Sequence, residues 1–208
     1  MKKKRCFGII CVRSNSNRLP NKCFLKFGEH TLIEHIIKRC KYNNIDPIIC
    51  TSKRKIDQKL IEKAVKNNIK YFRGDLNNKM KRMFDCATNF KLKSFHTIDA
   101  DDPFFEGDEI NKSMSLLMKK KLDIVTPSKF SQLGRAVTGY SVNTSFIKNL
   151  NRNYLSKNKF EHFWELIDCI GTLKIAKMKH KKNDKLKIRL TLDYKEDYWM
   201  LESLRKQV

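Results

Sequence analysis

Glycine and proline are scarce in this sequence, and long apolar segments are missing. The 208 residues include 7 Gly and 4 Pro. Neither the G-x-G-x-x-G pattern of dinucleotide-binding folds nor the G-x-x-x-x-G-K-[ST] pattern of P-loop NTPases occurs, which argues against both classes. No apolar run approaches the roughly 20 residues of a membrane span, and the basic start of the chain leads to no small-residue cleavage site. We therefore expect a cytoplasmic protein with no membrane partner.

Cysteine pairs with metal-binding spacing are also missing. The 7 cysteines are odd in number and form no C-x-x-C pair, and the 5 histidines show no zinc-ligand spacing. Most of the cysteines lie in apolar stretches, where a free thiol behaves as a small hydrophobic side chain. The sequence therefore predicts buried, reduced thiols rather than a disulfide framework or a zinc site.

Acidic residues are few relative to basic ones. The chain has 45 Lys and Arg against 22 Asp and Glu, a formal charge of +23 at pH 7. Such a surplus favours a nucleic-acid-binding protein, because basic surfaces release counterions from phosphates. However, the lysines are spread over almost every predicted helix, and no zinc-finger, RNP or basic-zipper pattern accompanies them. We therefore interpret the surplus as a solvated surface and expect no nucleic-acid partner.

Strand and helix patterns alternate along most of the chain. Apolar runs and turn signals predict strands over 6–12, 47–51, 69–72, 94–98, 122–126, 139–143 and 187–192. Helices are expected to start at Thr31, where Thr31 and Glu34 form a capping box, and over 56–67, 78–90, 108–120, 160–170 and 195–205. This order predicts one α/β domain, 1–208, with a mostly parallel sheet flanked by helices in a Rossmann-like arrangement. The pattern is irregular over 144–185.

The loop after the first strand carries an unusual set of side chains. Three cations and two hydroxyls follow one another there: Arg13, Ser14, Ser16, Arg18 and Lys22. Ligands of such sheets bind beyond the carboxyl ends of the strands. Arg supplies a planar fork and Lys a compact charge, so this loop suits a polyphosphate, with an ordinary polar loop as the alternative.

The same loop resembles a known family signature. Its sequence R-S-N-S-N-R-L-P-N-K is similar to the R-x-x-S-x-R-L-P-x-K of bacterial sugar cytidylyltransferases, most closely the spore-coat polysaccharide type, related to 3-deoxy-manno-octulosonate and acylneuraminate cytidylyltransferases. Further matches follow in order across nearly the whole chain: Cys50-Thr51-Ser52, Phe72-Arg73-Gly74, 98–105 (family I-T-G-D-C-P-L-I), Glu161-His162, and 189–193 with Glu196-Asp197 (family R-L-T-V-D-x-P-E-D).

This resemblance implies an enzyme with a nucleotide-diphospho-sugar-transferase-like fold. Its members join CMP from CTP to an acidic sugar or a related anionic acceptor and release pyrophosphate, here for surface glycan or glycoconjugate synthesis. By the same likeness, Asp101 and Asp193 are the Mg²⁺ ligands, with Asp99 or Asp102 assisting. Two carboxylates from loops far apart in sequence can meet at the edge of the sheet, and hard oxygens suit Mg²⁺. A plain turn at 101–103 is the alternative.

The resemblance also implies roles for the other polar residues. Arg13 and Lys22 would clamp the β- and γ-phosphates and, with Asp101, form the catalytic set. The nucleotide-binding set is expected to comprise these three together with Ser14 and Ser16 at phosphate or ribose, Thr51 and Ser52 at the cytosine, and Arg18 and Arg73. For Arg18 and Arg73, an ion pair that braces the loop is an equal alternative.

Departures from the family pattern leave the acceptor open. Asp102 stands where the family has Cys, and Thr138 replaces a frequent acidic residue. The acceptor can be a nonulosonic or octulosonic acid, a phosphonate or a sugar phosphate, with Lys129, Arg135 and His162 as candidate contacts.

The sequence leaves two alternative functions open and is compatible with a homodimer. One alternative is a nucleotidyltransferase that uses another NTP, although the Gly-rich first loop of such enzymes is missing. The other is a basic nucleic-acid-binding protein on a degenerate transferase fold. Relatives are commonly dimers, so the segment 144–185 is expected to supply either a homodimer interface or an acceptor-side region.

Overall fold

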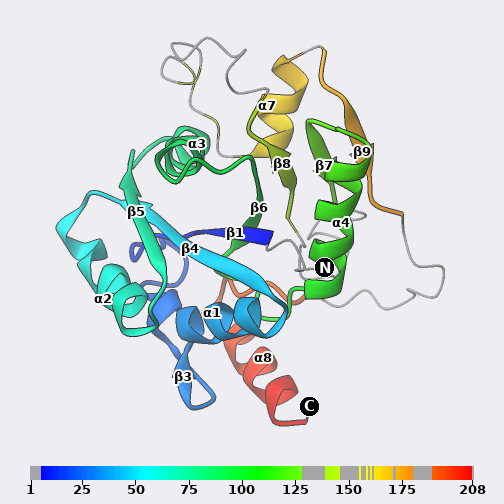
Figure 1. Ribbon diagram of the computed structural model, residues 1–208. Coiled ribbons are helices and arrows are strands. Elements are labelled where there is room, and N and C mark those ends of the chain that lie inside the picture. The colour runs from blue at the N-terminus through cyan, green and yellow to red at the C-terminus, as the bar shows by residue number, and fades with distance from the viewer. Residues whose placement is uncertain are drawn as a thin grey trace.

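The computed structural model describes residues 6–127, 139–145, 155, 158, 160, 162–170, 172–179 and 189–207. Within these residues, a seven-stranded sheet has the order β5-β4-β1-β6-β8-β7-β9 (Figure 1). The strands are β1 (Cys6–Cys11), β4 (Ile45–Ser52), β5 (Lys70–Gly74), β6 (Ser94–Asp99), β7 (Ile124–Thr126), β8 (Ser141–Asn143) and β9 (Ile175–Lys177). All neighbours pair in parallel except β8, which is antiparallel to β6 and β7. The predicted, mostly parallel α/β sheet is confirmed.

Helices cover both faces of this sheet. They are α1 (Leu32–Tyr42), α2 (Gln58–Lys66), α3 (Lys79–Asn89), α4 (Gly107–Lys119), α7 (Phe163–Cys169) and α8 (Lys195–Gln207). Two short 3₁₀ helices, η1 (Lys22–Phe24) and η2 (Lys55–Asp57), and the ribbon of β2 (Lys26–Phe27) and β3 (His30–Thr31) lie in the connections. Figure 1 shows α1 and α8 on one side of the sheet and α3 and α7 on the other.

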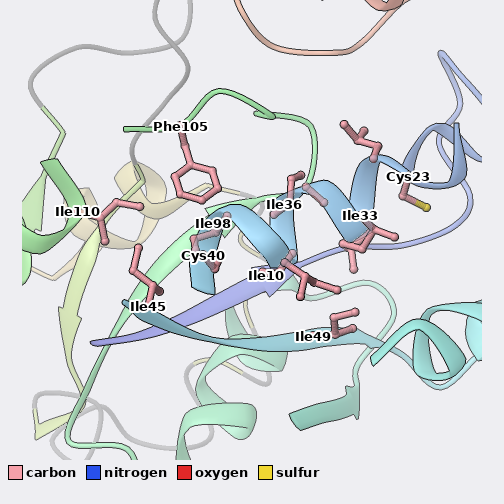
Figure 2. Close-up of a cluster of buried hydrophobic side chains, with 14 of the residues drawn as sticks. Ile10, Cys23, Ile33, Ile36, Cys40, Ile45, Ile49, Ile98, Phe105 and Ile110 are labelled. Atoms are coloured by element: carbon pink, nitrogen blue, oxygen red, sulfur yellow. The ribbon is translucent and has the colours of Figure 1, made fainter. Parts of the chain in front are cut away.

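The central strands are buried on both faces because their side chains alternate. In β1, Ile10 belongs to the core beneath α1, whereas Ile9 belongs to the core beneath α3 and α7. In β4, Ile49 and Ile48 divide in the same way. Figure 2 shows Ile10 and Ile49 in the first of these cores, beside the side chains of α1. A continuous apolar run is the sequence pattern that such a strand requires, as predicted for 6–12.

The start of α1 is fixed by the predicted capping box. The backbone amide of Thr31 donates to Glu34 at 3.1 Å, and its hydroxyl donates to the same carboxylate at 2.6 Å. Lys63 of α2 pairs with Glu34 at 3.0 Å. Glu34 therefore holds the first turn of α1 and joins it to α2.

Two sequence predictions need correction at the second half of the chain. A strand was expected over 187–192, but the described part, 189–192, is not a strand. Instead, the amide of Leu192 donates to the carbonyl of Asp101 at 2.7 Å, so the segment crosses the end of β6. Conversely, β9 lies in the segment that the sequence left irregular. Its three residues are too few to show an alternation, and only pairing with β7 defines the strand.

All seven cysteines are free thiols, and five of them are buried. None of the helices in the described part of the chain combines the length and the apolar character that a membrane crossing requires.

Glu34 gives the fold a specific pH dependence. Burial opposes ionisation, but the hydrogen bonds from Thr31 and the charge of Lys63 lower the pKa of Glu34 from 4.5 to about 2. Its contribution to stability is therefore complete above pH 4.5 and disappears as the pH falls towards 2. We expect Glu34→Gln to lower the free energy of unfolding at neutral pH by about 2 kcal/mol. In urea titrations this deficit should shrink on acidification, whereas Glu62→Gln, at an exposed position of α2, should show no deficit at either pH.

Candidate active site

A pocket of about 520 Å³ lies where β1 and β6 end. Its walls come from the segments after β1, β4 and β6 and from the first turn of α3. The sequence-predicted residues Arg13, Ser16, Arg18, Lys22 and Asp101 line it. The parallel order of the sheet brings these segments to the same edge.

The backbone of the first loop is closed on itself. The amide of Asn21 donates to the carbonyl of Ser14 at 3.2 Å, and the amide of Lys22 donates to Leu19 at 3.2 Å. Asn21 has a φ of 57°, in the left-handed region that Asn adopts more readily than most residues. This turn begins η1 at Lys22 and directs its side chain towards the end of β6.

Lys22 joins the two predicted metal ligands. Its ammonium nitrogen lies 2.7 Å from Oδ2 of Asp101 and 3.1 Å from Oδ1 of Asp193. It also donates to the carbonyl of Leu192 at 2.8 Å. A second bond between the two segments runs from the hydroxyl of Thr191 to Asp102, at 2.8 Å. Asp101 and Asp193, which are far apart in sequence, thus converge on one nitrogen atom.

Asp193 forms ion pairs with two further cationic side chains. Nη2 of Arg18 lies 2.7 Å from its Oδ1, and Arg189 pairs with its other oxygen. Arg189 also contacts Asp197 at 3.1 Å, and Asp197 accepts the amide of Asp193 at 2.9 Å. Arg18 was expected either to bind the nucleotide or to brace the loop through an ion pair. In the structure its guanidinium forms an ion pair with Asp193.

Ser14, Thr51 and Ser52 lie beneath the pocket and are buried. The amide of Ser14 donates to Asp57 at 2.8 Å, and the hydroxyl of Ser52 donates to the same carboxylate. Burial alone would raise the pKa of Asp57, but these hydrogen bonds lower it. Asp57 therefore fixes the ends of both β1 and β4. Sequence reasoning missed it, because an acid just before a helix is indistinguishable from an ordinary cap.

Three arginines frame the neighbouring wall. Arg13 donates to the carbonyl of Leu76 at 2.9 Å, and the buried Arg82 donates to the same carbonyl at 3.3 Å and to the sulfur of Cys11 at 3.1 Å. Arg73 instead donates to the carbonyls of Lys53 at 2.9 Å and Arg54 at 3.1 Å, beside an adjacent pocket. In the structure Arg73 thus braces the loop after β4.

A second ion pair in the pocket was not predicted. Lys79 begins α3 and lies 2.7 Å from Asp99 at the end of β6. Despite burial, which opposes both charges, the pair raises the pKa of Lys79 and lowers the pKa of Asp99. The sequence offered no signal for it, because Lys79 resembles the many surface lysines.

Of the candidate acceptor contacts, His162 stacks on Trp164 with ring centres 3.8 Å apart. Lys129 and Arg135 lie outside the described residues, as does Thr138.

The oxygens around Lys22 suit a divalent cation. Asp101, Asp193 and the carbonyl of Leu192 provide hard ligands within 3.1 Å of one point. Among the residues that the structure describes, no cluster of three or more His, Cys, Asp or Glu side chains forms a metal site. A Mg²⁺ or Mn²⁺ ion here would therefore complete its shell with water and phosphate oxygens, which is how Mg²⁺ commonly binds.

Comparison with known proteins identifies the family. The model of the cytidylyltransferase family matches residues 7–207. The chain belongs to the cytidylyltransferase family. It is accordingly an enzyme, a nucleotidyltransferase that uses CTP, as the sequence motifs predicted.

Solved structures agree on the fold of this cytidylyltransferase. A cytidylyltransferase from Leptospira borgpetersenii is 24% identical with a TM-score of 0.81, covering 99% of this chain and 87% of that one. A CMP:2-keto-3-deoxy-manno-octonic acid synthetase complexed with CTP has a TM-score of 0.71 at 11% identity, with 98% and 99% covered. Rv0371c from Mycobacterium tuberculosis, in complex with manganese, has a TM-score of 0.65 at 12% identity, with 96% and 99% covered.

Removing Asp57 should loosen the first loop of the cytidylyltransferase. Asp57→Ala leaves the amide of Ser14 and the hydroxyl of Ser52 without their acceptor. We expect a loss of about 2–3 kcal/mol in unfolding free energy and faster hydrogen–deuterium exchange in the peptide that contains Ser14. The exposed Asp108 provides the control, Asp108→Ala. Equal exchange of that peptide in the wild type and in Asp57→Ala would contradict the role of Asp57.

Proposed function

We propose that this enzyme transfers CMP from CTP to an anionic acceptor, an acidic sugar or a related compound, for the synthesis of a surface glycan or glycoconjugate in the cytoplasm. The observation that carries the proposal is that Lys22 brings Asp101 and Asp193 together beside a pocket that Arg13 also lines. The likeness to a synthetase that forms a CMP-linked acidic sugar supports this class of acceptor.

The charge of the pocket supports a metal–nucleotide ligand. Six cationic side chains and three carboxylates line it: Arg13, Arg18, Lys22, Arg54, Lys79 and Arg82 against Asp57, Asp99 and Asp101. The cationic excess favours a polyanion such as a triphosphate. The carboxylates at the edge favour a metal ion between protein and phosphates, because an oxygen anion would otherwise face Asp101 directly.

Asp101 and Asp193 would hold the metal ion in this proposal, as Mg²⁺ or, as in the manganese complex of Rv0371c, Mn²⁺. When bound, such an ion neutralises phosphate charge and polarises the phosphoryl group. Arg18 and Arg189 pair with Asp193 and orient it at the edge of the sheet. Asp102 positions Thr191, and through it the segment that carries Asp193.

Each side chain of the pocket then has a separate role in the transfer of the CMP group. An acceptor oxygen attacks the α-phosphorus in line, the bond from that phosphorus to the bridging oxygen breaks, and pyrophosphate leaves. Arg13 and Lys22 bind the β- and γ-phosphates and balance the charge that develops on the leaving group. Ser16 donates to a phosphate or to the ribose.

The cytosine would lie over the ends of β1 and β4. Ser14, Thr51 and Ser52 have buried side chains, so they would act through the backbone that they hold in place. Arg73 would keep the loop after β4 in position by its bonds to the carbonyls of that loop. A lone base needs few donors and acceptors, and backbone groups can supply them.

The opposite wall would receive the acceptor. Lys79 presents an ammonium group beside Asp99, and the charge of His162 also lowers the pKa of Asp99. An anionic group of the acceptor can pair with Lys79 on this side.

A homodimer completes the proposal. Trp164 of α7 and Ile175 of β9 are 43% and 40% exposed, and a second copy of the chain would cover these apolar side chains. Both belong to the segment 144–185. Analytical ultracentrifugation tests the assembly, and a monomer at micromolar concentration would contradict it.

Pyrophosphate release tests the proposed reaction. The wild type, supplied with CTP, Mg²⁺ and a panel of nonulosonic and octulosonic acids, sugar phosphates and phosphonates, should release pyrophosphate with at least one acceptor. Arg13→Met and Asp101→Asn should each lower kcat by about 10²–10³-fold, because each removes a charge that acts on the transition state. Lys38→Met removes one exposed charge from α1 and should leave turnover unchanged.

Three results would each contradict a part of this assignment. Full turnover by folded Asp101→Asn would remove Asp101 from the reaction. Faster turnover with GTP, UTP or dTTP than with CTP would show that CTP is not the preferred nucleotide substrate. Salt-sensitive binding of DNA or RNA, without turnover of any nucleotide, would favour the nucleic-acid-binding alternative.

A further inference from the structure

The ammonium group of Lys22 is fully used inside the protein. It has three N–H donors and three oxygen acceptors, on Asp101 at 2.7 Å, Leu192 at 2.8 Å and Asp193 at 3.1 Å. The side chain is 15% exposed, compared with 25% for Asp101 and 9% for Asp193. Lys22 therefore lies between the two carboxylates, at the point where they come closest to a common ligand.

The two carboxylates need a cation at this point. Both are largely withdrawn from water, and two like charges that share a site repel each other. Asp193 has Arg18 and Arg189 as additional partners. For Asp101, by contrast, Lys22 is the ion-pair partner that the described part of the chain provides. The charge of Lys22 thus stabilises Asp101 above all.

The same oxygens are the ones assigned to the metal ion. An ammonium group that donates to them occupies their lone pairs, and its charge repels a divalent cation a few ångströms away. Lys22 and the metal ion therefore exclude each other. We infer that Lys22 is an internal counter-cation: it holds Asp101 and Asp193 together in the ligand-free enzyme and yields them only when the metal ion arrives with a nucleotide.

The build of Lys22 permits this exchange. Its backbone is fixed by the turn at Asn21 and by the bond to Leu19, whereas its four-carbon stem is flexible. The ammonium group lies at the wall of the pocket, within a short swing of the space assigned to the triphosphate. When the metal ion takes the carboxylates, the phosphates offer Lys22 new acceptors. The carboxylates and Lys22 therefore each have a partner of opposite charge before and after the exchange. A metal ion that binds without a nucleotide gains little, because the displaced Lys22 then has no phosphate to pair with.

This inference rests on the proposed function, because it takes Asp101 and Asp193 as the metal ligands. It adds an order to the binding events: the metal ion binds with the nucleotide and not before it. Lys22 would then limit the binding of free divalent ions.

Mn²⁺ binding without nucleotide tests the exchange. Electron paramagnetic resonance of free Mn²⁺ measures the affinity of the wild type, of Lys22→Met and of the control Lys38→Met. Removing the competing ammonium should strengthen Mn²⁺ binding by about tenfold or more, while Lys38→Met should bind as weakly as the wild type. The double variant Lys22→Met/Asp101→Asn should lose the gain, which would locate the ion at these carboxylates.

Thermal unfolding provides a second readout. In EDTA, Lys22→Met should melt below the wild type, because its carboxylates repel each other, and Mn²⁺ should restore the loss. The wild type should respond little to Mn²⁺ alone. If the methionine variant does not fold, Lys22→Gln, which keeps hydrogen-bond donors without the charge, takes its place in both measurements.

The outcomes separate this inference from the proposed reaction. Equal Mn²⁺ affinity of wild type and Lys22→Met, or a gain that survives in the double variant, would overturn the exchange even if CTP is turned over. A gain that depends on Asp101 would support it even if none of the acceptors reacts.

Discussion

Asp193 is the carboxylate on which the ends of this chain converge. Arg18 and Lys22 reach it from the first loop, and Arg189 reaches it from its own segment just before α8. Its side chain is 9% exposed, and three cationic side chains stand in for the water that burial removes from it. Within the part of the chain that the structure describes, the segment that carries it pairs with no strand and is held beside β6 by the bonds of Leu192 and Thr191. The ion pairs of Asp193 therefore tie the first loop to the segment before α8, beside the pocket.

The rest of the pocket inherits its geometry from the sheet. Because Ile9 and Ile10 enter different cores, β1 cannot slide by one residue without exchanging its two faces. The register of β1 with β4 and β6 places Cys11 opposite both Cys50 and Asp99. The loops that follow these three strands therefore begin at neighbouring positions along the same edge of the sheet. Buried Asp57 then ties two of them together, through Ser14 and Ser52. Rigid placement of this kind is what phosphoryl transfer asks of a protein.

Features encoded over a few neighbouring residues were predictable from the sequence. The apolar run at β1 and the Thr31–Glu34 box each contain their own signal, and the first-loop motif pointed to the family. Features that depend on a distant partner were not predictable. The three residues of β9 become a strand only against β7, and the segment at 189–192 leaves the sheet because bonds to Asp101 and Asp102 hold it elsewhere. Lys79 and Asp57 are ordinary residues in sequence and acquire a role only through Asp99, Ser14 and Ser52.

The surplus of positive charge, +23 over the whole chain, does not by itself select a nucleotide over a nucleic acid. The mixture of charges in the pocket does favour the nucleotide. A surface for DNA or RNA gains from cations along an extended path, and carboxylates on that path would repel every phosphate that passes. Here Asp99 and Asp101 stand among the cations, each matched to one lysine. Such a set is well suited to a compact ligand whose own metal ion can take over from a lysine, and it is poorly suited to a continuous backbone of phosphates.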